Sequence, residues 1–505
     1  MTKDSKKKLD TTQMFLLALI PVLILIALLG LSVYLYGDNS LGGANQMALI
    51  VGAVIAGLVG WRLGFSWKEI EKGMVKSIKS ALPAILILLM IGALSGAWLI
   101  SGIVPTMIYY GLEILNPTIF LFAACVISAI VAVATGSSWS TVATVGVALI
   151  GIGGALGIDS AMSAGAIISG AYFGDKMSPL SDTTNLAPAM AGTDLFTHIR
   201  YMTLTTIPSI TITLLLFLII GFSITTNDSD VGALEMSKLI DENFVISPWF
   251  LLVPALVVFL IVKKVASLPA LFIGTIAGCL VAVFFQPDIV QEITGKYLQT
   301  EGDTVVWDPN YIQASYMASI DAMTTSVGIE TGDAGVNDLL SSSGMFGMLN
   351  TIWLIVCAMC FGGIMEACGL LQAITKVLMR MVRSTGSLIA TTTGTCLFFN
   401  TTASDQYLSI VVPGRMYADA YKDRGLAPQN LSRTLEDSGT VTSVLVPWNT
   451  CGATQSSVLG VATGEYFIYC FFNIISPIMT VVFGYVGIKI AKIKPKKKEE
   501  KALND

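Results

Sequence analysis

The chain has 505 residues, of which 54% are hydrophobic and only 12% are charged, and its formal net charge is -5. With a mean hydropathy of +0.74, a soluble protein could not cover its surface with polar groups, so the composition predicts an all-α polytopic membrane protein. Acidic and basic residues are sorted into different loops and form no basic face, which excludes nucleic acid as a partner.

The chain begins with a polar tail, residues 1–13, and then alternates apolar runs with loops of opposite character. Spans are predicted at Met14–Tyr36, Met47–Trp61 and Ala81–Ser101, with an amphipathic interfacial helix at Ser66–Ser80. Arg62 and four lysines lie between the second and third spans, whereas residues 37–45 contain no Lys or Arg. By the positive-inside rule, the N-terminus faces the cytoplasm.

The apolar pattern breaks up after the next span, Thr118–Ala134. A polar segment, Thr135–Thr141, and several short apolar pieces precede the next continuous span, Tyr201–Thr225. Short apolar segments interrupted by Gly and Pro are typical of discontinuous helices and re-entrant hairpins. Residues 14–226 are therefore predicted to form a first transmembrane repeat, which is followed by an acidic extracytoplasmic linker, residues 227–248.

A second transmembrane repeat is predicted at residues 249–488. Its spans are expected at Trp249–Val262, Ser267–Phe285, Met345–Glu366 and Tyr466–Ile488, with a broken region from Thr391 to Gly464. A polar, acidic insertion at about 287–343 is predicted to lie outside the cell. The basic tail, residues 489–505, is predicted to be cytoplasmic, so both termini face the same side.

The two halves are predicted to be inverted-topology repeats. Val51–Gly57 resembles Ile273–Gly278 at an offset of roughly 220 residues. Later matches lie at an offset of roughly 267 residues: Gly96 with Gly363, Ser101-Gly102 with Cys368-Gly369, Thr135-Gly136-Ser137 with Thr401-Thr402-Ala403, and Pro179 with Pro447. Because the first repeat starts at a basic loop and the second at an acidic one, the repeats should have opposite orientations in the membrane.

The stretch Gly170–Asp194 is unusually polar for its apolar surroundings and contains Asp175, Asp182 and Asp194. An unpaired carboxylate at membrane depth costs several kcal/mol, so such residues normally face water or a cation. Pro179 removes a backbone donor and frees a carbonyl, and unwound carbonyls are common sodium ligands in transporters. The stretch is therefore predicted to form half of a cation site.

A comparable polar region occurs in the second half. It consists of residues 400–407, 435–440 and 447–452, and it supplies hydroxyl, amide and carboxylate oxygens. Such hard ligands suit Na⁺, and a partly buried carboxylate can instead carry a proton. Two clusters that meet near the bilayer midplane would form one site that accepts either cation.

Three segments resemble the signature segments of the NhaC-type sodium/proton antiporter family of the wider ion-transporter superfamily: FGDKMSPLSDTTNLAPAMAGTDLFTHIRYM, ATGSSWSTVATVGVAL and LEDSGTVTSVLVPWNTCGA. The resemblance runs from about the second span to the last. It implies Na⁺/H⁺ exchange by alternating access across the inner (cytoplasmic) membrane, with no cofactor and with a scaffold that can form a homodimer. Related exchangers move malate, lactate or amino acids, so coupled transport of a small carboxylate or amino acid is the alternative.

The resemblance also implies a set of cation ligands. The first-half candidates are Asp175, Asp182, Thr183 and Asn185, and the second-half candidates are Asp405, Asp437, Asn449 and Thr450. Neighbouring hydroxyl residues are secondary candidates: Ser137, Ser138, Thr141, Ser181 and Ser404. On this hypothesis, Asp182→Asn abolishes Na⁺-dependent proton movement and leaves folding intact.

Structural roles are the alternatives for the same residues. Asp175 could pair with Lys176 at the cytoplasmic edge, and Asp405 could cap a helix N-terminus. Glu436 and Asp437 could lie on a solvated turn. The hydroxyl residues of the TGSSWST segment could serve close helix packing.

Other classes of membrane protein fit the sequence less well. The single His and the lack of a His-x-x-His or Glu-x-x-His pattern argue against a metalloenzyme. An inverted repeat favours alternating access over a continuous channel pore. The sequence thus predicts a transporter of Na⁺ and H⁺ in the lipid bilayer, and not an enzyme.

Overall fold

The computed structural model describes residues 10–36, 40, 42–224, 229–297, 299–301, 304–307, 309–333, 336–337, 340–380 and 382–493. Most of both predicted tails and small parts of the predicted linker and insertion lie outside these residues. Within the described part, eight helices are long and apolar enough to cross a membrane, or up to ten spans if two bent helix pairs are each counted once. The prediction of an all-α polytopic membrane protein is confirmed.

The first half contains three long helices followed by shorter, interrupted ones. Its elements are α1 (Thr11–Tyr36), α2 (Ala44–Arg62), α3 (Trp67–Ile100), α4 (Ile103–Ile114), α5 (Pro117–Thr135), α6 (Ser138–Thr141), the π-helical turn η2 (Val142–Gly146), α7 (Val147–Ala155), α8 (Ser160–Met177), α9 (Asp182–Ala191) and α10 (Leu195–Ser223).

Helix α3 differs from its prediction, because the expected interfacial helix and the following span form one helix of 34 residues. Ser66 caps it in a capping box with Glu69, which satisfies the backbone donors of the first turn. At 1.5 Å per residue the helix is about 51 Å long, whereas a hydrocarbon core is about 30 Å thick. The amphipathic first part of α3 therefore extends beyond the apolar layer without needing a break.

The second half begins with α11 (Ser229–Asn243), η3 (Pro248–Leu251), α12 (Leu252–Val262) and α13 (Ser267–Phe285). The region of the insertion contains α14 (Pro287–Thr294), η4 (Gly295–Tyr297), α15 (Tyr311–Thr324) and the strands β1 (Gln299–Glu301), β2 (Thr304–Trp307), β3 (Val327–Gly328) and β4 (Ser341–Ser342). The strands pair β1 with β2 and β3 with β4, both antiparallel.

The remaining elements repeat the mixture of long and interrupted helices. They are α17 (Gly344–Ala367), α18 (Leu370–Met379), α19 (Thr385–Thr402), α20 (Gln406–Asp423), α21 (Gln429–Leu435), the π-helical turn η5 (Glu436–Thr440), η6 (Ser443–Leu445), α22 (Thr450–Leu459), α23 (Thr463–Tyr466), η7 (Phe467–Tyr469) and α24 (Phe471–Val486). The last predicted span is thus bent, by 57°, between the segment Thr463–Tyr469 and α24.

The insertion is more than the polar external segment that the sequence suggested, because α15 packs against α3 and α17. A Cβ atom at Gly96 of α3 would lie 1.7 Å from the carbonyl oxygen of Ala322 in α15, so only glycine permits this approach. Helix α15 of the insertion is therefore part of the helical body.

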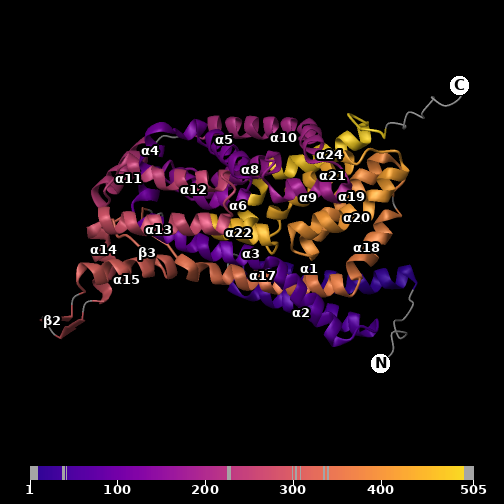
Figure 1. The fold of residues 1–505 in the computed structure, drawn as a ribbon, viewed down its shortest axis with the longest axis horizontal. Helices are drawn as coiled ribbons and strands as arrows, with labels where there is room; N and C mark the ends of the chain where they lie inside the picture. Colours follow the sequence, from indigo (N-terminus) through magenta and orange to yellow (C-terminus); the bar gives the residue numbers. More distant parts are fainter. Residues whose placement is uncertain are drawn as a thin grey trace, which may run out of the picture.

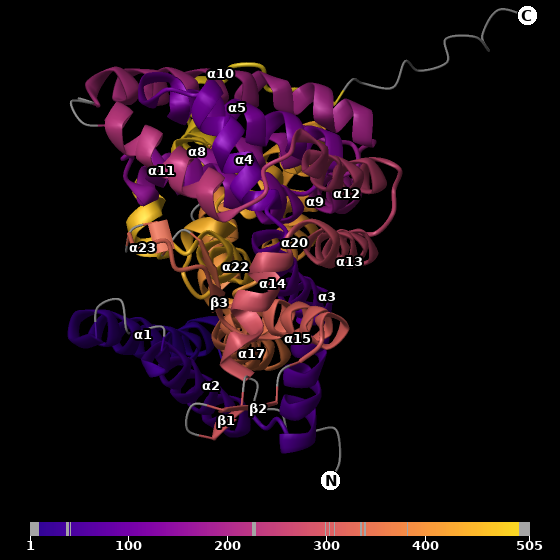
Figure 2. The same cartoon turned by 90° about the vertical axis from the view of Figure 1, so that its left-hand side faces the viewer.

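The helices form two layers (Figures 1 and 2). In Figure 2, α1, α2, α15 and α17 lie below, and α4, α5, α8 and α10 lie above. One cluster of buried apolar residues joins α1, α2, α17 and α18, and a larger cluster joins α5, α8, α10 and α12. In Figure 2, the interrupted helices α8, α9, α20 and α22 lie above α17.

The order of elements is similar after two equivalent glycines. Gly102 follows α3 and Gly369 follows α17, and both have left-handed backbone angles, φ 74° and 70°. Each is followed by a short helix, a long helix and a reversal at Gly136 or Ser404, which are also left-handed at φ 71° and 58°. These features agree with the predicted match of Ser101-Gly102 to Cys368-Gly369, while the inverted orientation of the halves stays a prediction.

Candidate cation site

In the first half, the reversal between α5 and α6 meets the break between α8 and α9. Gly136 ends α5, and a Cβ atom there would lie 2.6 Å from the Cβ of Leu180. Ser137 caps α6 by accepting a hydrogen bond from the Ser140 N–H at 3.2 Å. Across the break, the Thr184 hydroxyl donates to the Lys176 carbonyl at 3.0 Å, which satisfies a carbonyl at the end of α8.

Asp175 lies at this junction, near the end of α8, with an exposed fraction of 8%. Its Oδ2 accepts hydrogen bonds from the Ser138 N–H at 3.0 Å and from the Ser138 hydroxyl at 2.7 Å. The start of α6 carries partial positive charge, which stabilises a carboxylate. The ion pairs within the described part of the chain do not include Asp175.

Lys176 of the first half forms an ion pair with Asp437 of the second half. The alternative pairing of Lys176 with Asp175 does not occur among the ion pairs of the described residues. Both side chains are completely buried. The hydroxyls of Thr205, at 2.8 Å, and Thr480 donate to Asp437 Oδ2, and Ser476 donates to Oδ1 at 3.3 Å. A buried ion pair is tolerated only with such additional hydrogen bonds. The charge of Asp437 is therefore balanced within the protein in this conformation, and the alternative of a solvated turn at this position is wrong.

Glu436, the residue before Asp437, is also completely buried, in the π-helical turn η5. Its Oε1 accepts a hydrogen bond from the Thr183 hydroxyl at 3.0 Å, whereas Oε2 has no partner among the described residues. Glu436 is not among the site residues that the sequence predicts. The run Ser438–Thr440, which follows Asp437, could have indicated that this segment is buried. Small and hydroxyl residues are enriched where membrane helices pack closely.

The SDTTN segment, Ser181–Asn185, has some side chains in the interior and others on the surface. Ser181 and Thr183 are buried, and their hydroxyl oxygens lie 3.2 Å apart. Asp182 and Asn185 are exposed. The Asn185 amide donates to the Pro179 carbonyl at 3.0 Å and to the Ser181 carbonyl at 2.7 Å. The structure thus brings Ser181 and Thr183, but not Asp182 or Asn185, into the buried cluster.

The second reversal, between α19 and α20, has Asp405 at its centre. Asp405 has an exposed fraction of 4%, and its Oδ1 accepts a hydrogen bond from the Leu408 N–H at 2.8 Å. The helix-cap role that was an alternative for Asp405 is therefore confirmed. The neighbouring Ser404 hydroxyl is buried and makes no hydrogen bond within the described part of the chain.

The break before α22 meets this second reversal. The Thr450 N–H donates to the Ser404 carbonyl at 3.0 Å. The Asn449 amide donates to the Asn400 carbonyl at 3.0 Å, while its Oδ1 accepts from the Cys451 N–H at 3.0 Å. Four second-half candidates therefore lie together: Ser404, Asp405, Asn449 and Thr450.

The first-half secondary candidates have identifiable local roles. Ser138 binds Asp175, and Ser137 caps α6. The hydroxyl of Thr141 donates to the Ser137 carbonyl at 2.9 Å and lies 3.3 Å from the Thr135 hydroxyl. The TGSSWST segment, Thr135–Thr141, thus stabilises the reversal. Its Ser138 donates two hydrogen bonds to the carboxylate of Asp175.

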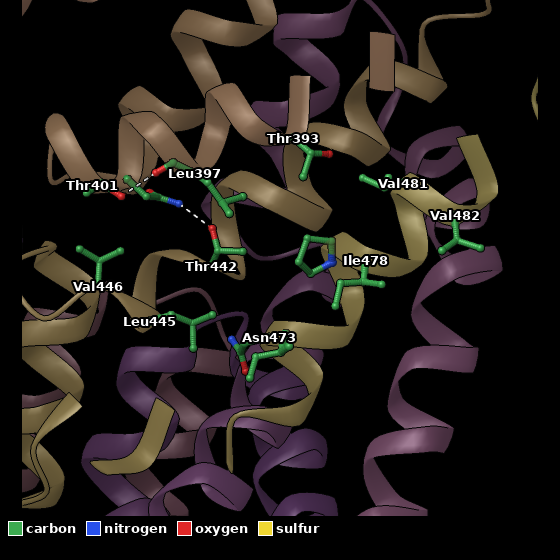
Figure 3. Close-up of a pocket in the computed structure, with 13 residues that line it drawn as sticks. Thr393, Leu397, Thr401, Thr442, Leu445, Val446, Asn473, Ile478, Val481 and Val482 are labelled. Carbon is green, nitrogen blue, oxygen red and sulfur yellow. Dashed lines mark hydrogen bonds between the residues drawn. The ribbon is translucent and has the colours of Figure 1, made fainter. Parts of the chain in front are cut away.

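A groove of about 460 Å³ lies beside the second reversal, between α19 and α24 (Figure 3). Leu397, Ile478 and Val482 line it and are exposed. Asn400 and Thr442 form its polar part, with the Asn400 amide donating to the Thr442 hydroxyl at 3.0 Å. Because no charged side chain lines it, the groove does not have the composition of a cation site.

A second buried basic residue, Arg433, lies one turn before Glu436. Its guanidinium carbon is 4.7 Å from the ring centroid of Tyr201 and 5.9 Å from that of Phe483. None of its nitrogens makes a hydrogen bond with the described residues. His198 is close by, since its Nδ1 lies 2.8 Å from the hydroxyl of Ser432. The two aromatic rings cover the faces of the guanidinium, and its edge carries unused donors.

Comparison with known proteins gives consistent matches along the chain. The sequence model of the Na⁺/H⁺ antiporter family matches residues 170–297 and 305–488. The Na⁺/H⁺ antiporter NhaC of Alkalihalophilus pseudofirmus is 38% identical over 448 residues, which are 88% of this chain and 91% of that protein.

Two further relatives are named for other substrates. The malate-2H⁺/Na⁺-lactate antiporter of Bacillus subtilis is 36% identical, over 88% of this chain and 89% of that protein. The arginine/ornithine antiporter ArcD of Halobacterium salinarum is 34% identical, over 96% of this chain and 95% of that protein.

Proposed function

The chain belongs to the Na⁺/H⁺ antiporter family, and from this premise we propose how its residues exchange Na⁺ for H⁺ by alternating access. Asp175 is the central cation ligand. A carboxylate that has an exposed fraction of 8%, accepts hydrogen bonds from Ser138 and has no basic partner among the described residues is a strong ligand for a hard cation. The buried hydroxyls of Ser181 and Thr183 are neutral oxygen ligands beside it.

The other candidates have supporting roles in this proposal. The exposed Asp182 and Asn185 attract the cation at the approach to the site. Asp405, Asn449 and Thr450 hold the second reversal beside the first. Asp437 anchors Lys176, and the buried ammonium limits the number of positive charges that the site can hold at once.

The orientation of the chain follows from loop charge. The start of α1 and the last described residues lie at the right-hand end of Figure 1, and α11, α14 and β2 lie at the left-hand end. The right-hand end faces the cytoplasm in our proposal, because both ends of the described chain lie there and the sequences that flank them are basic. The layer of α1, α2 and α17 is the scaffold, where a homodimer would form, and the interrupted helices are the moving part. A transporter of this kind needs no catalytic nucleophile, so no enzymatic activity is proposed.

The test is a flux assay with protein reconstituted into liposomes that contain a pH-sensitive dye. A Na⁺ step should change the internal pH for the wild-type protein, and Asp175→Asn should reduce the change to that of protein-free liposomes. Asp194→Asn is the matched control, because Asp194 is exposed and caps α10 in a way that Asn preserves. Wild-type-like exchange by Asp175→Asn would remove Asp175 from the site.

A second candidate function is coupled movement of a small carboxylate or amino acid. The specific observation in its favour is Arg433, a buried guanidinium without a hydrogen-bond partner among the described residues. Its free edge matches a carboxylate in bidentate geometry. The same liposomes, assayed with malate, lactate, arginine or ornithine present, test this candidate. A Na⁺-driven pH change that is independent of all four solutes would exclude it.

A further inference from the structure

The groove between α19 and α24 has the size and the lining of a small-molecule pocket. Its volume of about 460 Å³ falls within the range of roughly 300–1,000 Å³ that is typical of ligand pockets. Its apolar wall includes Leu397 on α19, Leu445 and Val446 in the break before α22, and Ile478 and Val482 on α24 (Figure 3). Because no charged side chain lines the groove, its composition favours a neutral ligand.

The mouth of the groove is apolar. Leu397, Ile478 and Val482 have exposed fractions of 40%, 56% and 45%. Helix α24 belongs to a bent helix pair that is long and apolar enough to cross a membrane, and exposed apolar side chains on such helices contact hydrocarbon. We therefore expect a ligand to enter the groove from the lipid and to have an apolar body.

One polar side chain in the wall of the groove has an acceptor without a hydrogen-bond partner among the described residues. Five polar side chains line the groove, and four of them make hydrogen bonds within the protein: Thr393, Asn400, Thr401 and Thr442. The fifth, Asn473, is completely buried (Figure 3). Its amide nitrogen donates to the Val441 carbonyl at 2.7 Å, but its Oδ1 accepts no hydrogen bond from the described residues.

Pro477 removes a backbone donor next to the same side chain. It lies inside α24, and a proline has no N–H to give to the carbonyl four residues earlier. In α24 that carbonyl belongs to Asn473. Hydrocarbon contains no water that could supply a missing donor. A ligand hydroxyl that reaches Asn473 therefore gains a hydrogen bond that the described residues do not make with its Oδ1.

We propose that this groove binds a neutral alcohol that is dissolved in the membrane. The hydroxyl donates to Asn473 Oδ1, and the alkyl chain lies along Leu397, Ile478 and Val482 toward the lipid. An ammonium or a carboxylate would have no counter-charge in the groove, and the methyl end of a phospholipid acyl chain cannot donate to Asn473. This site is separate from the cation site, so the proposal does not depend on the Na⁺/H⁺ exchange proposed above.

Photolabelling in liposomes tests this site. The probe is decanol with a diazirine in its chain, applied to the complete protein in phosphatidylcholine liposomes, and mass spectrometry locates the labelled residues. Label should appear on α19 and α24 at the groove, and unlabelled decanol should displace it. Decane with the same diazirine is the matched control, because it lacks the hydroxyl group and should label the groove only weakly.

Two variants separate the hydroxyl contact from the space that the chain fills. Asn473→Leu removes the acceptor and should raise the decanol concentration for half-displacement by about tenfold, which corresponds to one buried hydrogen bond. Leu397→Trp puts a larger side chain at the mouth and should abolish labelling. If loss of the bond to Val441 unfolds Asn473→Leu, as its melting temperature will show, Leu397→Trp still tests the site. Leu215→Trp is the control and should be labelled like the wild type, since Leu215 is exposed on α10, away from the groove.

Three results would contradict the proposal. Equal labelling by the decanol and decane probes would show that Asn473 recognises no hydroxyl group. Labelling of the groove by phosphatidylcholine with a diazirine in its acyl chain, undisturbed by decanol, would show that a lipid chain fills it. Wild-type labelling of Leu397→Trp would place the label outside the groove. Each of these results would overturn the proposal, and none of them bears on Na⁺/H⁺ exchange.

Discussion

The breaks in the two halves of the molecule are alike in backbone and different in charge. In each, a left-handed residue reverses the chain, Gly136 or Ser404, and the following helix is capped by the next side chain, Ser137 or Asp405. In the first half, Asp175 has no basic partner within the described part of the chain. In the second half, Asp437 is neutralised by a lysine from the first half.

This difference shows that two similar chain reversals need not have the same electrostatic surroundings. Asp437 of the second half already has a basic partner, Lys176, whereas Asp175 of the first half has none within the described part of the chain. For this reason our proposal makes Asp175, and not Asp437, the central Na⁺ ligand. The two reversals have similar backbones, and the side chains that they carry give them different charge.

The largest expected effect comes from breaking the buried ion pair. Lys176→Ala should lower the free energy of unfolding by about 3–5 kcal/mol, because it leaves a buried carboxylate without its counter-ion. Chemical denaturation in mixed micelles measures this loss. The double variant Lys176→Met with Asp437→Asn should recover most of it.

Asp175→Asn, in contrast, should leave the unfolding free energy nearly unchanged, because no ion pair is broken. An equal loss of stability in Lys176→Ala and Asp175→Asn would contradict the distinction between the two halves.

The next effect tests how closely each reversal is packed. Gly136→Ala should cost about 2–4 kcal/mol, from the left-handed backbone and from the contact with Leu180. Ser404→Ala should change stability by less than about 1 kcal/mol, because Ser404 already has a Cβ and its hydroxyl makes no hydrogen bond with the described residues. The same denaturation assay compares the two variants, and similar costs would show that the reversals are equivalent after all.

The smallest effect concerns Asp405. Asp405→Ala should cost about 1 kcal/mol, through loss of the cap on Leu408 N–H, and Asp405→Asn should preserve this stability. Both should weaken apparent Na⁺ affinity by about tenfold, equivalent to about 1.4 kcal/mol, since Asp405 lies outside the central group of ligands. The Na⁺ dependence of exchange in liposomes measures the affinity. Complete loss of exchange in Asp405→Asn would place Asp405 on equal terms with Asp175.

The sequence by itself determined the membrane class, the positions of most spans and the two interrupted regions, because long apolar runs, Gly and Pro act locally on the backbone. It also predicted a match of Gly102 with Gly369, which agrees with their left-handed backbone angles. It did not reveal that α15 packs into the helical body, or that α3 continues without a break.

Only the tertiary structure decided which polar side chains meet. It buried Glu436, exposed Asp182, and paired Lys176 with Asp437 across two halves of the chain. The physical reason is that membrane helices are apolar on most faces, so hydrophobic periodicity does not distinguish the face toward lipid from the face toward other helices. Which residues share a site therefore depends on packing between helices that are far apart in the sequence. The residue pattern of a single helix does not specify that packing.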